Sequence, residues 1–479
     1  MDNLKEKTAK GLFWGALNNG TMQILNVIIG ILLGRMLTPE EWAPIGMIAI
    51  FSAIAGNLQS SGFSTAIINM KQPTDNDYNA VFWFNTITSF CIYLVLFAVA
   101  PWIAVFFEQP CLTDLSRFIF LAFFISSLGI STNAYMMKNM MQREMTIVSL
   151  TALVISGTTA IIMAFNGYSY WSLAWQQVVN STMLIIGRWY FVKWRPSLKI
   201  DFSPIRKTFR FSMNILVTMI VNTVNNNILT FVFGKLFART PQVVGNFFQA
   251  YKWDSMAFQT VGGMVGQVAQ PVLVSVRDEK DREQQVFRKM LRFTSFLSFP
   301  ALFGLALVAR EFILCTIGWK WIECVPLLQI LCISGAFMPV YTLYQNLIIS
   351  HGRSDINMWL NIGQIALQLG VILAFYQQGI TTMVMAYTTF NILWLLMWMI
   401  FAKRIIGLRI VDTAKDMLPF VLCGGVVMLI TYYSTRMIAN IYLLLTVRVV
   451  IAAALYYGVM RLLNVVILRE CLQYIFKKK

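Results

Sequence analysis

A lysine and an aspartate lie two residues apart within a long apolar segment of the sequence. The stretch Gln249–Met256 reads QAYKWDSM, and it belongs to an apolar segment of residues 243–276. Lys252 is about ten residues, or roughly 15 Å along a helix, from the first end of that segment. In a membrane, a charge at that depth costs about 2.5–3.5 kcal/mol on insertion scales and usually marks a pathway or a ligand. Lys252 is therefore our first candidate binding residue.

Further polar residues share the helix face of Lys252. With about 100° of rotation per residue, an arc of about 80° also holds four glutamines and a glycine, namely Gln249, Gln259, Gly263, Gln267 and Gln270. Asp254 lies about 200° away from Lys252, so the two side chains cannot pair on one face. We expect Asp254 to find its partner on another helix or near an interface.

Two earlier segments carry comparable polar faces. Within about 60° of helix rotation, the first apolar segment places Asn19, Gln23, Asn26 and Gly30. Asn226 lies 200 residues after Asn26, in the stretch NTVNNN of residues 222–227. A water-filled cleft between two lobes would explain such faces, and a cation among amides suits a ligand with phosphate and sugar groups. We predict substrate contacts from Lys252, Gln249, Gln259, Asn226, Asn19, Gln23 and Asn26.

Each of these residues also has a purely structural interpretation. Amides between membrane helices can hold the helices together, at about 0.6–2 kcal/mol each. Lys252 could form a structural ion pair with an acid on another helix. Both alternatives remain open at the level of sequence.

The composition is that of a polytopic membrane protein. Of the 479 residues, 58% are hydrophobic and 12% are charged, and the mean hydropathy is +0.65, whereas soluble domains are about 25% charged. The net charge of +17 comes from basic residues in short loops between apolar spans, which indicates a lipid bilayer and not nucleic acid as the partner. Seven cysteines without a CxxC pair and a single histidine do not provide the convergent ligands of a zinc or haem site, so we expect no metal centre and no cofactor.

The apolar segments predict an all-α fold of about 14 transmembrane helices. Each segment has roughly the 17–25 apolar residues that a membrane helix needs: residues 11–35, 43–70, 79–107, 115–137, 146–165, 169–192, 209–234, 243–275, 289–309, 323–350, 356–377, 380–401, 416–435 and 440–462. The first is too long for a signal-peptide core, so we expect it to be retained. With both termini in the cytoplasm, 29 of the 38 lysines and arginines lie on the inner side and 7 on the outer side, as the positive-inside rule requires.

An internal repeat predicts two lobes. The stretch LLGRMLTPEEWAPIGM of Leu32–Met47 aligns with VFGKLFARTPQVVGNF of Val232–Phe247, 200 residues and six spans later. A weaker match joins residues 133–145 and 342–355. An even number of spans gives both copies the same direction across the membrane, which is typical of parallel-repeat transporters. We therefore predict two pseudo-symmetric six-helix lobes, residues 1–195 and 196–408, followed by a C-terminal helix pair with a basic tail, residues 409–479. The alternative is that both stretches are a common way to end a helix.

Several motifs resemble those of the polysaccharide flippases, the lipid-linked oligosaccharide exporters of the multidrug/oligosaccharidyl-lipid/polysaccharide superfamily, with colanic and teichuronic acid exporters as the most similar branch. They are GRMLTPEEWAPIGM, the segment Ser60–Asn85, PVLVSVRDEKDREQQVFRKMLR, FPALFGLAL, GWKWIECVPLLQIL and HGRSDINMWLNI. The resemblance spans residues 5–415 and implies two six-helix lobes that alternate between inward-open and outward-open states. It also implies that the cargo is an undecaprenyl-diphosphate-linked oligosaccharide, that the location is the bacterial cytoplasmic membrane, and that a glycan polymerase or ligase of the same pathway is a partner.

The sequence departs from this family at two positions. Many relatives have an arginine near Gln249, and an acid where Ser60 precedes Ser61-Gly62-Phe63. We therefore carry over no residue role, and Lys252 is the candidate to replace the arginine.

Two other classes of membrane protein compete with this interpretation. A glycosyltransferase, polymerase or ligase would place acids on a large outer loop; Glu40 and Glu41 lie in a short one, so we expect no enzyme. A cation-coupled multidrug exporter of the same fold would need buried carboxylates, and we expect Asp254, which faces away from the polar stripe, to be the only clearly intramembrane acid of this sequence.

Overall fold

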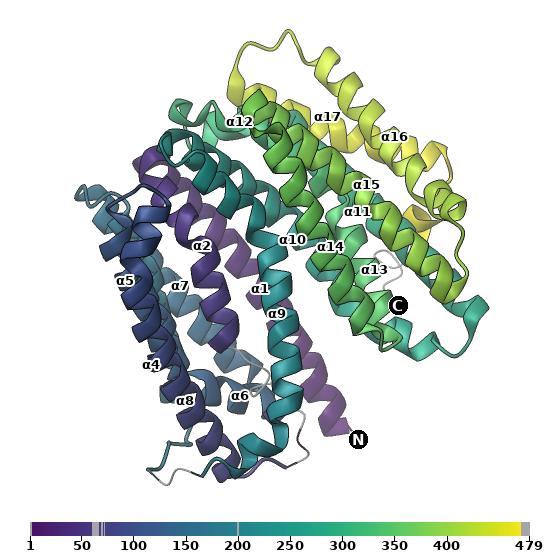
Figure 1. Ribbon diagram of the computed structural model, residues 1–479. Coiled ribbons are helices and arrows are strands. Elements are labelled where there is room, and N and C mark those ends of the chain that lie inside the picture. The colour runs from purple at the N-terminus through teal and green to yellow at the C-terminus, as the bar shows by residue number, and fades with distance from the viewer. Residues whose placement is uncertain (1, 60–66, 69, 71, 199–200, 471–479) are drawn as a thin grey trace. The chain divides into compact units, whose positions relative to one another are not determined.

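The computed structural model describes the backbone of residues 2–59, 67–68, 70, 72–198 and 201–470. Within these ranges the regular elements are all helices, as Figure 1 shows. Residues 60–66, which begin the Ser60–Asn85 motif and include the departure at Ser60, lie outside the described residues, as does most of the basic tail. Helices satisfy their backbone hydrogen bonds internally, which a membrane requires of any spanning segment.

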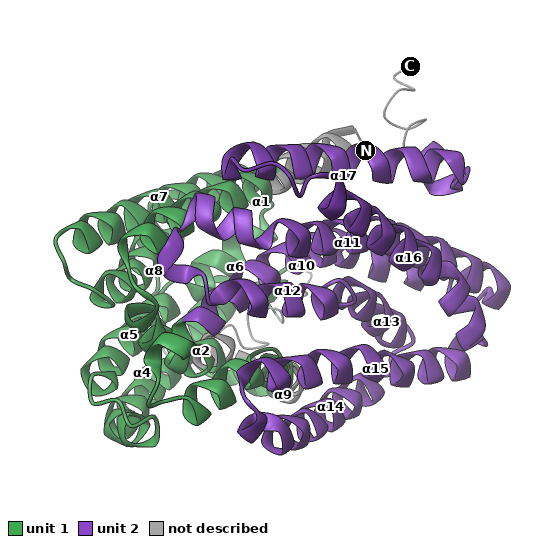
Figure 2. Ribbon diagram, turned by 90° about the horizontal axis from the view of Figure 1, so that it is seen from above, with its two compact units in different colours: residues 1–245 green, residues 246–479 purple. Residues whose placement is uncertain are grey.

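The chain divides into two compact units, Met1–Gly245 and Asn246–Lys479, which Figure 2 colours separately. The first unit holds the helices α1 (Asp2–Met36), α2 (Pro39–Gln59), α4 (Asp75–Phe106), α5 (Leu112–Ser127), α6 (Ile130–Lys138), α7 (Gln142–Phe165), α8 (Trp171–Phe191) and α9 (Ser203–Leu236). The helix α10 (Pro241–Val276) begins in this unit and continues in the second.

The second unit contains most of α10 and all later elements. These are α11 (Lys280–Thr316), η1 (Trp319–Trp321), α12 (Cys324–Gly335), α13 (Met338–Ser350), α14 (Ser354–Phe375), η2 (Tyr376–Gln378), α15 (Ile380–Ile406), α16 (Ile410–Ser434) and α17 (Ile441–Leu462). The long helix α11 packs against α12, α13, α16 and α17, so it forms the centre of this unit.

Local sequence signals explain several helix ends. Thr74 and Asp77 form a capping box at the start of α4, where each side chain accepts a hydrogen bond from the other residue's backbone N–H. Gly407 ends α15 in the left-handed conformation, with φ of 77°, which a residue with a Cβ adopts at a cost. Both ends fall within a few residues of the predicted span boundaries.

The described helices include nine that are long and apolar enough to cross a membrane, or ten if the pair α5 and α6, bent by 43°, counts as one span. A helix or a helix pair covers most of each of the 14 predicted spans. The helices α2, α8, α9 and α10 do not pass this test. In α10 the reason is visible in the sequence, because a lysine, an aspartate and five glutamines lower its hydropathy.

The two units differ in their boundary from the predicted lobes. Their division falls within α10 because α9 packs on α2 and α4, which places it with the first unit by contacts. The predicted division at residue 195 follows the sequence repeat instead, and it remains a prediction.

Candidate functional site

The polar stripe of α10 runs from a buried end to an exposed end. Gln249 is fully buried, and neither its amide nitrogen nor its amide oxygen has a hydrogen-bond partner among the described residues. Lys252 is half-buried, and its Nζ lies 5.7 Å from the centroid of the Trp253 ring. The rest of the stripe, which is Gln259, Gly263, Gln267 and Gln270, is exposed. The buried polar atoms of Gln249 are the part of the stripe that most needs a ligand or water.

Asp254 faces another helix, as predicted. Its side chain is 3% exposed and lies beside the Cys332 thiol of α12. On the same helix, a Cβ added to Gly335 would lie 2.2 Å from Asp254 Oδ1, so only glycine permits this approach. Asp254 therefore joins α10 to α12.

Glycines hold α10 against α13 on a further side. Gly262 and Gly266 both face Thr342, with their added Cβ atoms at 3.6 Å from its side chain. This small-xxx-small spacing is a common way for membrane helices to approach closely. The sequence analysis did not use this signal, although GGMVG at residues 262–266 shows it.

The remaining predicted contact residues lie in the first unit. On α1, Asn19 is exposed, while Gln23 and Asn26 are half-buried; on α9, Asn226 is exposed. The helix α1 packs on α7, where an added Cβ at Gly157 would lie 2.3 Å from Ile29 Cδ1. The structure thus gives each residue its helix and exposure, and the convergence of α1, α9 and α10 on one cargo remains a prediction.

The two repeated stretches contact each other within the first unit. A Cβ added to Gly245 would lie 1.8 Å from the backbone oxygen of Pro39, at the start of α2. A Cβ added to Gly234 would lie 3.2 Å from Met47 Cγ. The two helix ends that the sequence predicts on the outer side of the membrane are therefore packed together. The closest of these contacts is possible only because residue 245 is a glycine.

An ion-pair cluster reinforces this packing from the loop after α4. Glu108 Oε2 accepts a hydrogen bond from Arg239 Nε at 2.7 Å, and Glu108 Oε1 lies 3.4 Å from Lys235 Nζ. Lys235 also donates to the Phe106 backbone oxygen at 2.5 Å, and Gln109 donates to the Ala238 oxygen at 2.8 Å. The Arg239 hydrogen bond and charge, with Lys235, lower the pKa of the Glu108 carboxyl. The contact is thus present above the usual pKa of glutamate and is lost only as the pH falls through the lowered value.

We expect Glu108→Gln to loosen this cluster. Nearby Cys111 reports on it, because burial raises the pKa of its thiol and slows its alkylation. In a chain whose other cysteines are replaced by alanine, Glu108→Gln and Arg239→Gln should each speed maleimide labelling of Cys111 by about 1.5- to 5-fold at neutral pH, the range expected for an exposed ion pair. The double variant should be no faster than either single one. If the labelling rate of the double variant rose by the product of the two single increases, Glu108 and Arg239 would not act through one contact.

Buried acids are more numerous than the sequence analysis expected. The statement that Asp254 is the only clearly intramembrane acid is wrong, because Glu311 of α11 is 2% exposed and lies 2.8 Å from Arg448 of α17. The predicted span of residues 289–309 stopped short of Glu311, whereas α11 continues to Thr316. This pair also explains why α17 carries an arginine.

A small polar pocket in the first unit has no acid. It has a volume of about 220 Å³ and lies among α2, α5 and α8; its polar residues are Ser52, Ser126, Gln177, Asn180 and Ser181. Among the described residues, no group of three or more His, Cys, Asp and Glu could hold a metal ion. The chemistry of the described polar residues is thus that of hydrogen bonds and single charges.

Comparison with solved structures identifies the fold. The chain matches the lipid II flippase MurJ in its inward closed conformation with a TM-score of 0.72 and 13% identity, over 97% of this chain and 99% of MurJ. It matches an inward-facing multidrug resistance MATE family transporter of the MOP superfamily with a TM-score of 0.65 and 14% identity, over 80% of this chain and 94% of the transporter. These likenesses establish the fold that the two share.

Sequence relatives cover most of the chain. The lipopolysaccharide biosynthesis protein WzxC of Escherichia coli K12 is 24% identical over 80% of this chain and 81% of its own length. The teichuronic acid biosynthesis protein TuaB of Bacillus subtilis 168 is 24% identical over 84% of each chain. The succinoglycan biosynthesis transport protein ExoT of Rhizobium meliloti 1021 is 21% identical over 72% of this chain and 70% of its own. The family described as polysaccharide biosynthesis protein matches residues 32–326, more than half of the chain, and the chain belongs to this family.

Proposed function

We propose that this protein is a transporter that flips an undecaprenyl-diphosphate-linked oligosaccharide, such as an O-antigen, capsule or exopolysaccharide unit, across the bacterial cytoplasmic membrane. The observation that carries the proposal is the family match, with relatives named for polysaccharide biosynthesis and one named as a transport protein. The likeness to a lipid II flippase supports a fold suited to a lipid-linked cargo.

The proposed mechanism is alternating access between two lobes. We assign the lobes to residues 1–195 and 196–408, with residues 409–479 as an added helix pair, about 14 transmembrane helices and both termini in the cytoplasm. In this arrangement the packed ends of the repeats, where Gly245 meets Pro39, form the closed outer gate. Opening would separate them and break the contacts of Glu108.

Within the cleft, we propose that Lys252 binds the diphosphate of the cargo. A lysine ammonium attracts phosphate as a point charge, and its hydrogen bonds to an anion are about twice as strong as neutral ones. Gln249, one helical turn away, has both amide atoms buried, and neither finds a partner in the part of the chain that the structure describes, so it can bind a sugar hydroxyl or a phosphate oxygen. Gln259, Asn226, Asn19, Gln23 and Asn26 are the proposed sugar contacts.

The test is complementation of cells that lack the gene, with variants at matched membrane levels. Lys252→Gln should lower export by about 10- to 100-fold, the effect of losing one charged hydrogen bond. Surface glycan and the lipid-linked precursor on the cytoplasmic leaflet are the two readouts. Lys252→Arg, which keeps the charge, and Asp254→Asn, which changes a residue facing α12, are the controls. Normal surface glycan in the deletion strain would overturn the cargo, and full activity of Lys252→Gln would overturn the phosphate contact.

The same strains test a cation-coupled multidrug exporter, which the MATE likeness keeps as a second candidate. Such an exporter needs buried carboxylates free to take up H⁺ or Na⁺. The described pocket of the first unit has none, and in the second unit Glu311 and Asp416 are paired with arginines. The buried Asp254 forms no ion pair among the described residues, so Asp254→Asn also tests this second candidate. Drug susceptibility that rises in the deletion strain with unchanged glycan would favour this function instead.

A further inference from the structure

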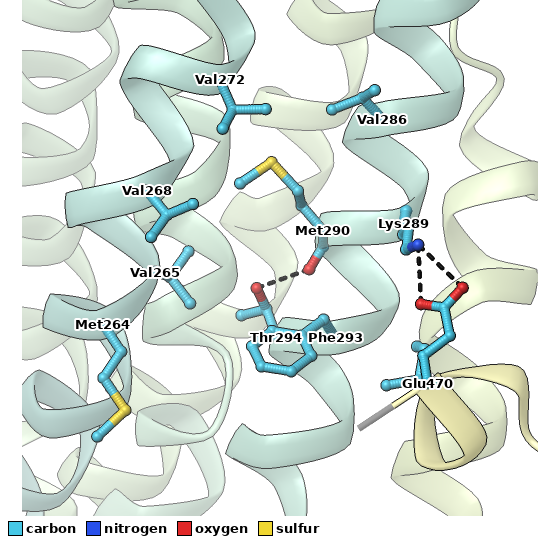
Figure 3. A pocket seen from close by; sticks show the side chains of 11 residues that line it. Met264, Val265, Val268, Val272, Val286, Lys289, Met290, Phe293, Thr294 and Glu470 are labelled. Carbon is cyan, nitrogen blue, oxygen red and sulfur yellow. Dashed lines mark hydrogen bonds and ion pairs between the residues drawn. The ribbon is translucent and has the colours of Figure 1, made fainter. Parts of the chain in front are cut away.

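An apolar groove lies on the second unit beside α10 and α11. It has a volume of about 600 Å³, and its lining is shown in Figure 3: Met264, Val265, Val268 and Val272 from α10, Val286, Lys289, Met290, Phe293 and Thr294 from α11, and Ile467 and Glu470 after α17. Met264 and Val268 are more than half exposed. On a membrane-spanning chain, exposed apolar side chains face the acyl chains of the bilayer, and a groove among them has room for one such chain.

A basic pocket adjoins this groove. It has a volume of about 430 Å³ and shares Lys289, Ile467 and Glu470 with the groove. Three cations line it, Arg288, Lys289 and Arg292, together with the amides of Gln285 and Asn464. One continuous site therefore offers an apolar channel and a cationic end.

Two acids neutralise most of this charge. Asp416 accepts from Arg288 Nε and Arg292 Nε, both at 2.6 Å, and Glu470 lies 2.8 Å from Lys289 Nζ. Among these five side chains, three cations against two acids leave one positive charge in excess, and Asp412 also acts on Arg288 from outside this set. An arginine has five N–H donors, so both guanidinium groups keep donors for a further oxygen.

We propose that this site binds one anionic phospholipid of the bilayer, with an acyl chain in the apolar groove and its phosphodiester against Arg288, Lys289 and Arg292. A single excess positive charge complements a phosphodiester, which carries one negative charge, better than it complements a diphosphate. The groove residues of α10 also lie about 120–220° around the helix from Lys252, so the site is on a different face of α10 from the proposed diphosphate contact.

The site is tested by binding phosphatidylglycerol, with phosphatidylcholine as the reference, to the purified full-length protein in detergent after delipidation. Lys289→Gln should weaken phosphatidylglycerol binding about tenfold, since it removes a charged donor. Glu470→Gln should strengthen it, because it removes the acid that competes for Lys289. A merely structural ion pair would make the two variants change binding in the same direction, and that result would overturn the proposal.

A matched pair of valines on α10 tests whether the apolar groove holds an acyl chain of the lipid. Val268→Trp fills the groove and should abolish the preference for phosphatidylglycerol, whereas Val274→Trp, equally an exposed valine of α10 but outside the groove, should leave it unchanged. Equal binding of both lipids, or displacement of phosphatidylglycerol by undecaprenyl diphosphate at a lower concentration, would overturn the assignment. Because the readout is lipid binding in detergent, it does not depend on transport or on the identity of the cargo.

Discussion

Arg448→Leu is expected to lower the free energy of unfolding by about 3–5 kcal/mol, because it leaves the buried Glu311 carboxylate without its partner. Arg448 is 6% exposed, and its Nη1 lies 2.8 Å from Glu311 Oε2, in the geometry of an ion pair and not of an aligned hydrogen bond. Arg448 also donates from Nε to Thr435 Oγ1 at 3.1 Å, and its guanidinium lies 5.1 Å from the Tyr432 ring centroid. One side chain thus connects α17 with α11 and α16.

The matched double variant separates pairing from packing. Replacing both charges, in Arg448→Leu with Glu311→Leu, should recover most of the lost stability, since a buried ion pair and an apolar pair of similar size are often close in free energy. Unfolding of the purified protein in detergent, followed by heating or by denaturant, measures both variants. If the double variant were less stable than Arg448→Leu alone, Glu311 would not be the group that the arginine compensates.

The same pair illustrates what could be predicted from the sequence. Hydropathy finds apolar segments, and a helix or a helix pair lies over most of each predicted one. Hydropathy does not show where a helix ends when its last turns carry charged residues. The predicted span therefore stops at residue 309, and Glu311 falls in the loop that follows it. The partners of Glu311 and Asp254 lie 137 and about 80 residues away in the sequence, and only packing brings them together.

The face of a polar residue was predictable, but its burial was not. Rotation of about 100° per residue places Gln249 and Gln259 on one side of α10. The structure buries the first completely and exposes the second, because burial depends on which helices cover each turn. Rotation also puts Asp254 away from Lys252, and the structure agrees by turning Asp254 toward α12. Periodicity therefore assigns directions around a helix, while neighbours decide environments.

Gly245→Ala is expected to prevent the start of α10 from reaching the start of α2. The added methyl group would lie 1.8 Å from the Pro39 backbone oxygen, and backbone atoms cannot move aside as a flexible side chain can. Overpacking of this kind typically costs about 1–3 kcal/mol, and more where the backbone must shift. We expect a lower melting temperature, faster labelling of Cys111, and loss of export in the complementation assay, because the proposed outer gate can no longer close.

Gly263→Ala is the matched control on the same helix. An added Cβ at Gly263 meets nothing within 4 Å, so only the helix propensity changes, which favours alanine by about 0.8–1.0 kcal/mol. This variant should therefore be at least as stable as the wild type, and its Cys111 labelling should be unchanged. A stable and fully active Gly245→Ala protein would mean that the contact with Pro39 is not needed for closure. If Gly245→Ala lowers the melting temperature and Gly263→Ala does not, the cause is the close approach of Gly245 to Pro39 and not the loss of a glycine in α10.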